Sequence, residues 1–130
     1  MPDSTLDLRI IRGSTFLRAS LQGGINLAMS RNALRDVLAG DAHNSYDVLL
    51  DVRRSHVQLT SQEVMTLVED LKAHAPRFRR RMALLDSQWG KNLSSMQFLQ
   101  ALAEREGFQV KTFVDFESAM DWLWAGQVGT

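Results

Sequence analysis

The chain has 130 residues, 45% of them hydrophobic, and its fifteen basic residues balance its fifteen acidic residues. We expect residues 1–130 to form one domain with a single core, ordered over about residues 5–125. Zero net charge gives no global electrostatic reason to bind nucleic acid or an anionic membrane. The absence of cysteine excludes disulfides, thiolate chemistry and sulfur-ligated metals.

The N-terminal residues contain no apolar stretch of signal-peptide length. No apolar run elsewhere approaches the roughly 20 residues of a membrane helix. The sequence therefore predicts a cytoplasmic protein without an integral membrane segment.

The first elements form a predicted antiparallel hairpin. Apolar residues alternate with polar ones over residues 6–10 and again over residues 16–21, which is the pattern of half-buried strands. Gly13 and Ser14 lie between them, where a hairpin turn is expected. A short helix is then predicted to begin at Ser30, as the N-cap, and to close at Gly40.

The stretch from Tyr46 to Ala75 is the best-defined part of the pattern. Residues 48–50 form a continuous apolar run typical of a strand buried on both faces, and the predicted strand ends at Asp51. A helix is predicted to start at Thr60, because Glu63 three residues later completes a capping box. Ala75 and the proline after it stop this helix.

Two further strand–helix units follow, with strands predicted at residues 79–86 and 108–114 and with Asp115 capping the last helix. Alternation of this kind is typical of right-handed crossovers in a parallel sheet. The predicted fold is α/β, with a mixed, mainly parallel sheet of four to five strands, an N-terminal antiparallel hairpin and about four packed helices.

The ordered set of motifs resembles the STAS domain family, in its SpoIIAA-like, bacterial-type branch. The resemblance covers nearly the whole chain and rests on four short segments: LRASLQGGI, YDVLLDVR, RMALLDS and KTFVDFESAMDWLW. It implies the STAS/SpoIIAA-like fold. In the family a serine in an Asp-Ser-Ser-Gly helix start is phosphorylated. Placing Asp51 on the family's strand-end aspartate puts Thr60 and Ser61 on the two serines, while Leu59 and Gln62 depart from the motif.

Thr60 and Ser61 are accordingly the phosphorylation candidates, since a helix N-terminus favours negative charge. The alternative is that Thr60 is simply an N-cap. Three aspartates, Asp51, Asp86 and Asp115, follow the three predicted parallel strands, where open α/β sheets bind ligands. The three histidines (His43, His56 and His74) lack metal-ligand spacing, so no metal and no cofactor is expected.

Arg53 and Arg54 are candidate ligand-binding residues, because guanidinium groups bind carboxylates and phosphates bidentately. Trp89, in the loop after Asp86, is the third candidate. The four arginines between residues 77 and 81 are interpreted as a solvated face. Trp122 and Trp124 flank an inward-facing Leu123, so at least one indole is expected at an interface or pocket wall. A homodimer through this last helix is compatible with that pattern.

No sequence motif of a hydrolase, nucleotide-binding loop or metalloprotease is present. The leading hypothesis is a non-enzymatic binding module that carries or senses an apolar or amphiphilic anionic small ligand, with the charged end near Arg53, Arg54 and the Thr60 helix start. The alternative is a regulatory protein-interaction domain of the anti-sigma-factor-antagonist type, switched at Thr60 or Ser61. A cavity of a few hundred Å³ beside the Thr60 helix would favour the carrier, and a filled interior would favour the interaction domain.

Overall fold

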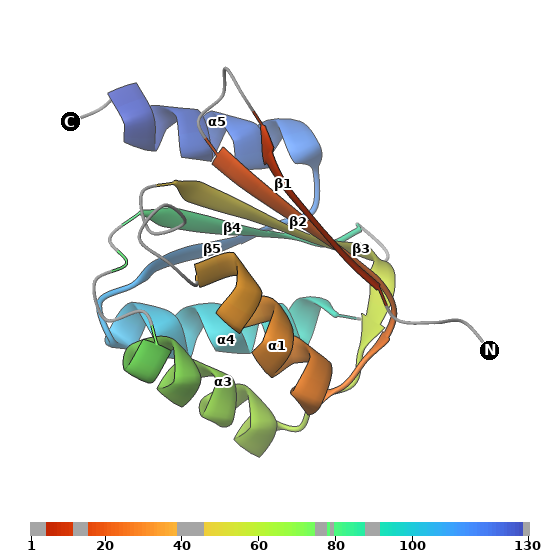
Figure 1. The fold of residues 1–130 in the computed structure, drawn as a ribbon. Helices are drawn as coiled ribbons and strands as arrows, with labels where there is room; N and C mark the ends of the chain where they lie inside the picture. The colour runs from red at the N-terminus through yellow and green to blue at the C-terminus, as the bar shows by residue number, and fades with distance from the viewer. Residues whose placement is uncertain are drawn as a thin grey trace.

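The computed structural model describes residues 5–11, 16–38, 46–74, 78, 80–87 and 92–128. One five-stranded sheet lies between two layers of helices (Figure 1). The strands are β1 (Thr5–Ile11), β2 (Phe16–Ile25), β3 (Asp47–Val57), β4 (Arg81–Leu85) and β5 (Gln109–Phe113). The helices in the described residues are α1 (Leu27–Leu38), α3 (Ser61–His74), α4 (Leu93–Arg105) and α5 (Phe116–Val128). The order of strands and helices is the predicted one.

The strands follow one another across the sheet in the order β1-β2-β3-β4-β5. β2, β3, β4 and β5 are parallel to one another, while β1 pairs antiparallel with β2. Each parallel pair is joined by a segment that contains a helix, as a crossover between parallel strands requires. The fold is therefore α/β, and its sheet is mainly parallel.

β3 is longer than the sequence pattern indicates. The predicted strand ends at Asp51, but β3 continues to Val57 by pairing with the second half of β2, beyond the point where its pairing with β4 stops. The register shifts there, so that Val52 and Arg53 both lie opposite Leu21, which is a β-bulge. Gly23, on the partner strand, has φ of 87°, a value that favours glycine. The apolar pattern did not predict this extension, because this half of β3 is polar and has only one strand neighbour.

The start of α1 also differs from the prediction. The helix begins at Leu27, and Asn26 caps it by accepting a hydrogen bond from the backbone N–H of Met29 at 2.9 Å. Ser30 is not the N-cap. It lies inside the first turn, where its hydroxyl donates to the backbone carbonyl of Asn26 at 2.9 Å. Asparagine is as good a cap as serine, so composition alone did not separate the two positions.

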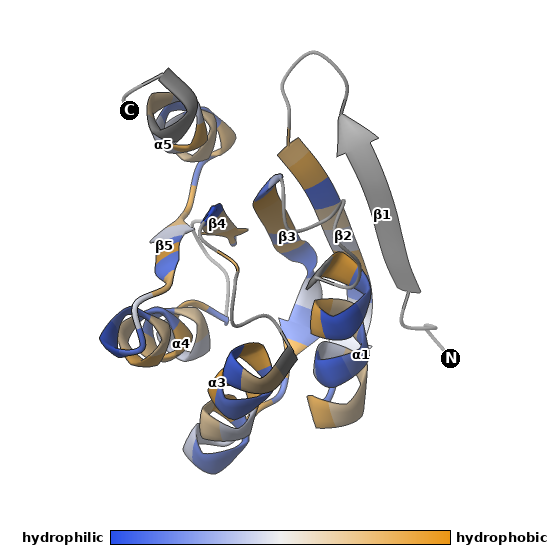
Figure 2. Cartoon of the chain, turned by 60° about the vertical axis from the view of Figure 1, so that its left-hand side comes forward, coloured by the Kyte–Doolittle hydropathy of each residue, from blue (hydrophilic) through white to orange (hydrophobic). Residues whose placement is uncertain are grey.

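The two faces of the sheet are covered differently (Figures 1 and 2). α1, α3 and α4 cover one face and enclose the larger apolar cluster, which includes Leu17, Val48 and Leu84. α5 lies on the other face and encloses a smaller cluster. The buried members of that smaller cluster are Phe16, Leu49, Ala83, Leu85, Ala119 and Leu123.

Candidate functional site

The start of α3 is built as predicted. The Thr60 hydroxyl accepts a hydrogen bond from the backbone N–H of Glu63 at 3.1 Å, and the Glu63 carboxylate accepts one from the backbone N–H of Thr60 at 2.9 Å. These two bonds confirm the capping box. Ser61, the first residue of the helix, is exposed. Thr60 is thus occupied by its structural role, and the phosphorylation of either hydroxyl stays a prediction.

Arg53 takes part in an ionic cluster on the α5 face of the sheet. Its guanidinium donates to both carboxylate oxygens of Asp51, at 3.0 and 2.8 Å, and its backbone N–H donates to the same carboxylate at 3.0 Å. The guanidinium of Arg18, on β2, donates to Asp51 at 3.2 Å. The Asp51 side chain is only 8% exposed, while the two arginines are each more than a third exposed. We call these three residues the arginine cluster.

The charge state of Asp51 follows from these contacts. Burial raises the pKa of its carboxyl, but hydrogen bonds and charge from Arg53, together with a hydrogen bond from Arg18, outweigh burial and hold the pKa below its usual value. Asp51 is therefore ionised at neutral pH, and the cluster carries one net positive charge.

The structure does not bring Arg53 together with the start of α3, as the predicted ligand site requires. The Arg53 guanidinium lies 6.0 Å from the centre of the Phe116 ring, on the α5 face, whereas α3 and its Thr60 start pack on the opposite face. Arg53 cannot hold the charged end of a ligand placed between the sheet and α3. Arg54 is exposed and pairs with Gln22 of β2 through the backbone register. Trp89 lies outside the described residues, so its predicted role is not addressed by the structure.

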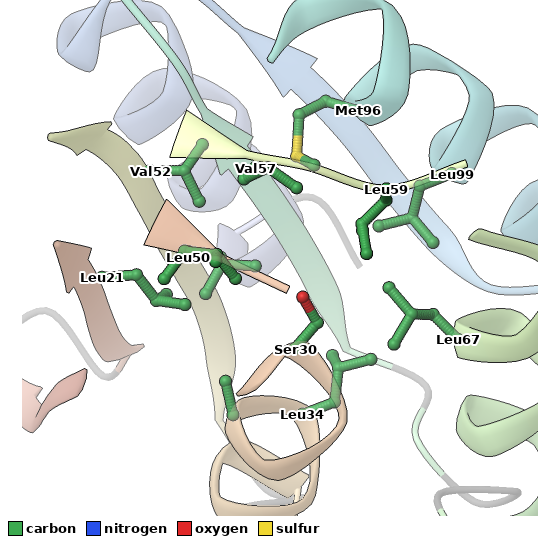
Figure 3. A pocket seen from close by; sticks show the side chains of 12 residues that line it. Leu21, Ser30, Leu34, Leu50, Val52, Val57, Leu59, Leu67, Met96 and Leu99 are labelled. Atoms are coloured by element: carbon green, nitrogen blue, oxygen red, sulfur yellow. The ribbon is translucent and has the colours of Figure 1, made fainter. Parts of the chain in front are cut away.

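An apolar cavity does lie between the sheet and the three-helix layer, beside α3 (Figure 3). Its volume is about 40 Å³. Ser30 is the only polar residue among those that line it, and the Ser30 hydroxyl is already bonded to Asn26. The other lining residues are Leu21, Ile25, Ala33, Leu34, Leu50, Val52, Val57, Leu59, Leu67, Met96 and Leu99. A cavity of this size with apolar walls remains dry, and it is far smaller than a lipid pocket.

A buried polar network joins the carboxyl end of β4 to the extended half of β3. The Asn92 side chain, in a residue that is 1% exposed, accepts from the backbone N–H of Val57 at 2.8 Å and donates to the carbonyl of Ser55 at 3.0 Å. It also donates to the carbonyl of Val52 and to the Asp86 carboxylate, both at 3.3 Å. Asn92 holds the N-cap position of α4, but its side chain bonds β3 instead of the helix.

The three strand-end aspartates do not form one site. Asp51 belongs to the arginine cluster, and Asp86 is bound to Asn92 and to the backbone N–H of Ser87. Asp115 is exposed and accepts from the backbone N–H of Ser118 at 2.8 Å, which confirms it as the cap of α5. Within the described residues, no group of three acidic or histidine side chains is placed to hold a metal ion.

α5 carries apolar side chains on a flank that the sheet does not cover. Phe116, Met120 and Trp124 are spaced four residues apart, which aligns them along one side of the helix. Phe116 is 39% exposed and Trp124 is 57% exposed, while Met120 is partly buried. We call these three residues the α5 stripe. It borders the arginine cluster through the contact between Arg53 and Phe116.

Trp122 lies on the opposite flank of α5. Its ring packs against Phe113 of β5, with ring centres 5.6 Å apart, and the Arg81 guanidinium lies 4.9 Å from it. Arg81 also donates to the backbone carbonyl of Trp122 at 2.6 Å. The two tryptophans therefore have different roles: Trp122 is bound to the sheet, and Trp124 is presented outward.

The architecture defines a class, an α/β domain with a mainly parallel sheet and an antiparallel first strand. Among solved structures, the chain is similar to an uncharacterized protein of the DUF3478 family from Shewanella loihica PV-4 that is described as having a SpoIIAA-like fold. The two share 18% sequence identity over 92% of this chain and 93% of that chain, with a TM-score of 0.58. The protein therefore has a SpoIIAA-like fold, as the sequence resemblance implies.

No family model and no curated protein matches the sequence. None of the helices in the described part of the chain is long and apolar enough to cross a membrane.

Proposed function

We propose that this chain is a non-enzymatic binding module of the STAS type that acts by docking to a protein through α5. The observation that carries the proposal is the α5 stripe, with its outward-facing Trp124, beside the arginine cluster. Aromatic side chains and arginine are the residue types most enriched where protein interfaces gain their affinity.

The small volume of the interior cavity favours protein docking over the carriage of a small ligand. A pocket for a ligand of drug size or larger has a volume of several hundred Å³. The cavity beside α3 measures about 40 Å³ and offers one hydroxyl that is already bonded. The guanidinium of Arg53, which would hold the ligand's anionic end, is on the other face of the sheet. Binding energy is thus better available at the α5 surface than inside the molecule.

Photo-crosslinking in the native host tests the proposal. A photoreactive amino acid in place of Trp124 would report docking at α5, and the same group in place of Met65 is the matched control. Met65 is 52% exposed but lies on α3, in the opposite helix layer. We expect a defined crosslinked protein from position 124 that position 65 does not give. Equal or absent crosslinking at both positions would reject docking through α5.

A second candidate function, the carriage of a small apolar molecule, is favoured by the location of the cavity. It lies between the sheet and the helix layer, where the sequence hypothesis places it (Figure 3). At its present volume it would accept a guest of only a few heavy atoms. Native mass spectrometry before and after organic extraction tests this function together with thermal shift against a fatty acid series. Recovery of no ligand and no shift in unfolding temperature would reject it.

Regulation at Thr60 or Ser61 is the remaining part of the interaction hypothesis. Both residues are exposed, but the Thr60 hydroxyl is engaged by the backbone N–H of Glu63, which makes Ser61 the stronger candidate. Phosphoproteomics of the native host would locate a phosphate. If Thr60→Ala and Ser61→Ala both give the crosslinking pattern of the unmodified chain, the switch hypothesis fails.

A further inference from the structure

We infer that the protein that docks on α5 is a second copy of this chain, in a twofold-symmetric dimer. This inference rests on the docking surface proposed above and adds the identity of the partner. It is carried by the distribution of charge around the α5 stripe, which is complementary to itself under one particular symmetry operation.

The stripe has a basic border on its sheet side. Arg53 lies against Phe116, and Arg18 is held close to Arg53 because both guanidinium groups bind the Asp51 carboxylate. Both arginines are partly exposed, at 36% and 38% of their side-chain surface. The cluster's single net positive charge is therefore accessible to a partner along this edge of the stripe.

The stripe has an acidic border on its other side. Glu117 and Asp121 are both exposed, and the helical rotation of about 100° per residue places them next to Met120 and Trp124 on the side away from the core residues Ala119 and Leu123. The described residues of α5 include no lysine or arginine. The exposed surface thus runs from basic through apolar to acidic across the helix.

A twofold interface places each surface patch against its own copy, so the patch must complement itself. An axis that runs along α5 sets the acidic border of each copy against the basic border of the other, while Phe116, Met120 and Trp124 meet their counterparts. An axis across α5 would set acidic against acidic and basic against basic, which is unfavourable. Charge complementarity therefore selects the parallel arrangement of the two α5 helices.

Sedimentation velocity of the full chain over about 5 to 500 µM tests this inference, a range suited to a small interface. We expect a monomer–dimer equilibrium. Trp124→Ala should raise the dissociation constant about 30-fold, the effect of truncating a central tryptophan. Glu117→Lys should raise it about tenfold at low salt and less at high salt, because an exposed ion pair is screened. Met65→Ala is the matched control and should have no effect. Circular dichroism checks that each variant is folded.

A chain that stays monomeric over the whole range overturns the inference. So does a dimer that Trp124→Ala and Glu117→Lys weaken no more than Met65→Ala does. The proposed function fails separately from this inference. If the chain is monomeric but still crosslinks another protein from position 124, the dimer is rejected and docking through α5 is retained. If neither self-association nor crosslinking depends on position 124, both proposals are rejected.

Discussion

The two faces of the sheet differ in how many helices cover them and in how apolar they are. The face under α1, α3 and α4 is continuous and apolar, and its cluster extends from Leu17 on β2 to Val110 on β5. The face under α5 is apolar at Phe16, Leu49, Ala83 and Leu85, and it becomes ionic at Arg18, Asp51 and Arg53. A single helix cannot cover five strands. The α5 face therefore has a small buried apolar cluster under the helix and a partly polar, exposed surface beside it. This division is the basis of our proposal that the three-helix face supplies most of the stability and the α5 face the recognition surface.

The largest expected effect comes from the three-helix face. Leu84→Ala removes a fully buried side chain between neighbours on both adjacent strands, and we expect a loss of about 3–4 kcal/mol in the free energy of unfolding. Leu123→Ala, at the equivalent burial on the α5 face, should cost about 2 kcal/mol, because a single helix can shift to close the space. Urea unfolding of both variants measures the difference. Equal losses would contradict the division between the faces.

Asn92→Ala is expected to cost about 2–3 kcal/mol, since it leaves the Val57 N–H and two carbonyls of β3 without their buried partner. Thermal unfolding followed by circular dichroism measures this loss. Ser95→Ala, in the first turn of the same helix and half-exposed, is the matched control and should change stability by less than about 0.5 kcal/mol. A small loss at Asn92 would show that water can replace the asparagine.

Asp51→Asn should cost about 1–2 kcal/mol at neutral pH, because two guanidinium groups lose their anionic partner. The folded-state pKa of Asp51 lies below its unfolded value, so the carboxylate stabilises the fold above the unfolded pKa of about 3.9. That stability is lost as the pH falls through the lower folded pKa. Unfolding free energies of the two chains should therefore converge once the pH is below the folded-state pKa of Asp51. A difference that is constant with pH would refute ionisation as the cause.

Trp124→Ala should have the smallest effect on stability, within about 0.5 kcal/mol, when it is measured on the monomer at low concentration. The indole is more than half exposed, so little apolar area is lost. Chemical unfolding at low and at high protein concentration separates the two contributions. A large loss in the dilute protein would assign Trp124 to the core instead of the recognition surface.

Local patterns in the sequence predicted the elements whose causes are local. The capping box at Thr60 and Glu63 and the cap at Asp115 each depend on side chains within three residues of the helix start, and both are present. The order of strands and helices follows from the change between alternation and helical spacing of apolar residues. These features require no knowledge of the rest of the chain.

The features that the sequence did not reveal depend on contacts over long separations. The second half of β3 is polar, and it forms a strand because β2 pairs with it along one edge. On its other edge, the side chain of Asn92 bonds the backbone of Val57, which is 35 residues away in the chain. Simple alternation places Arg53 on the same face as Asp51, two residues before it, and the contact with Phe116 shows that this is the α5 face. Because the predicted strand ended at Asp51, the sequence hypothesis did not apply this alternation to Arg53 and placed it beside the start of α3, on the opposite face.

The bond between Asn92 and the backbone of Val57 also sets how the molecule opens. Val57 is paired with β2 on one side and has a side chain from the start of α4 on the other, so its amide proton is exposed only when α4 leaves the sheet. Hydrogen exchange at that one amide therefore reports the undocking of α4, a segment distant from it in the chain. α4 is also a wall of the cavity through Met96 and Leu99, so its undocking would open that side of the cavity to solvent.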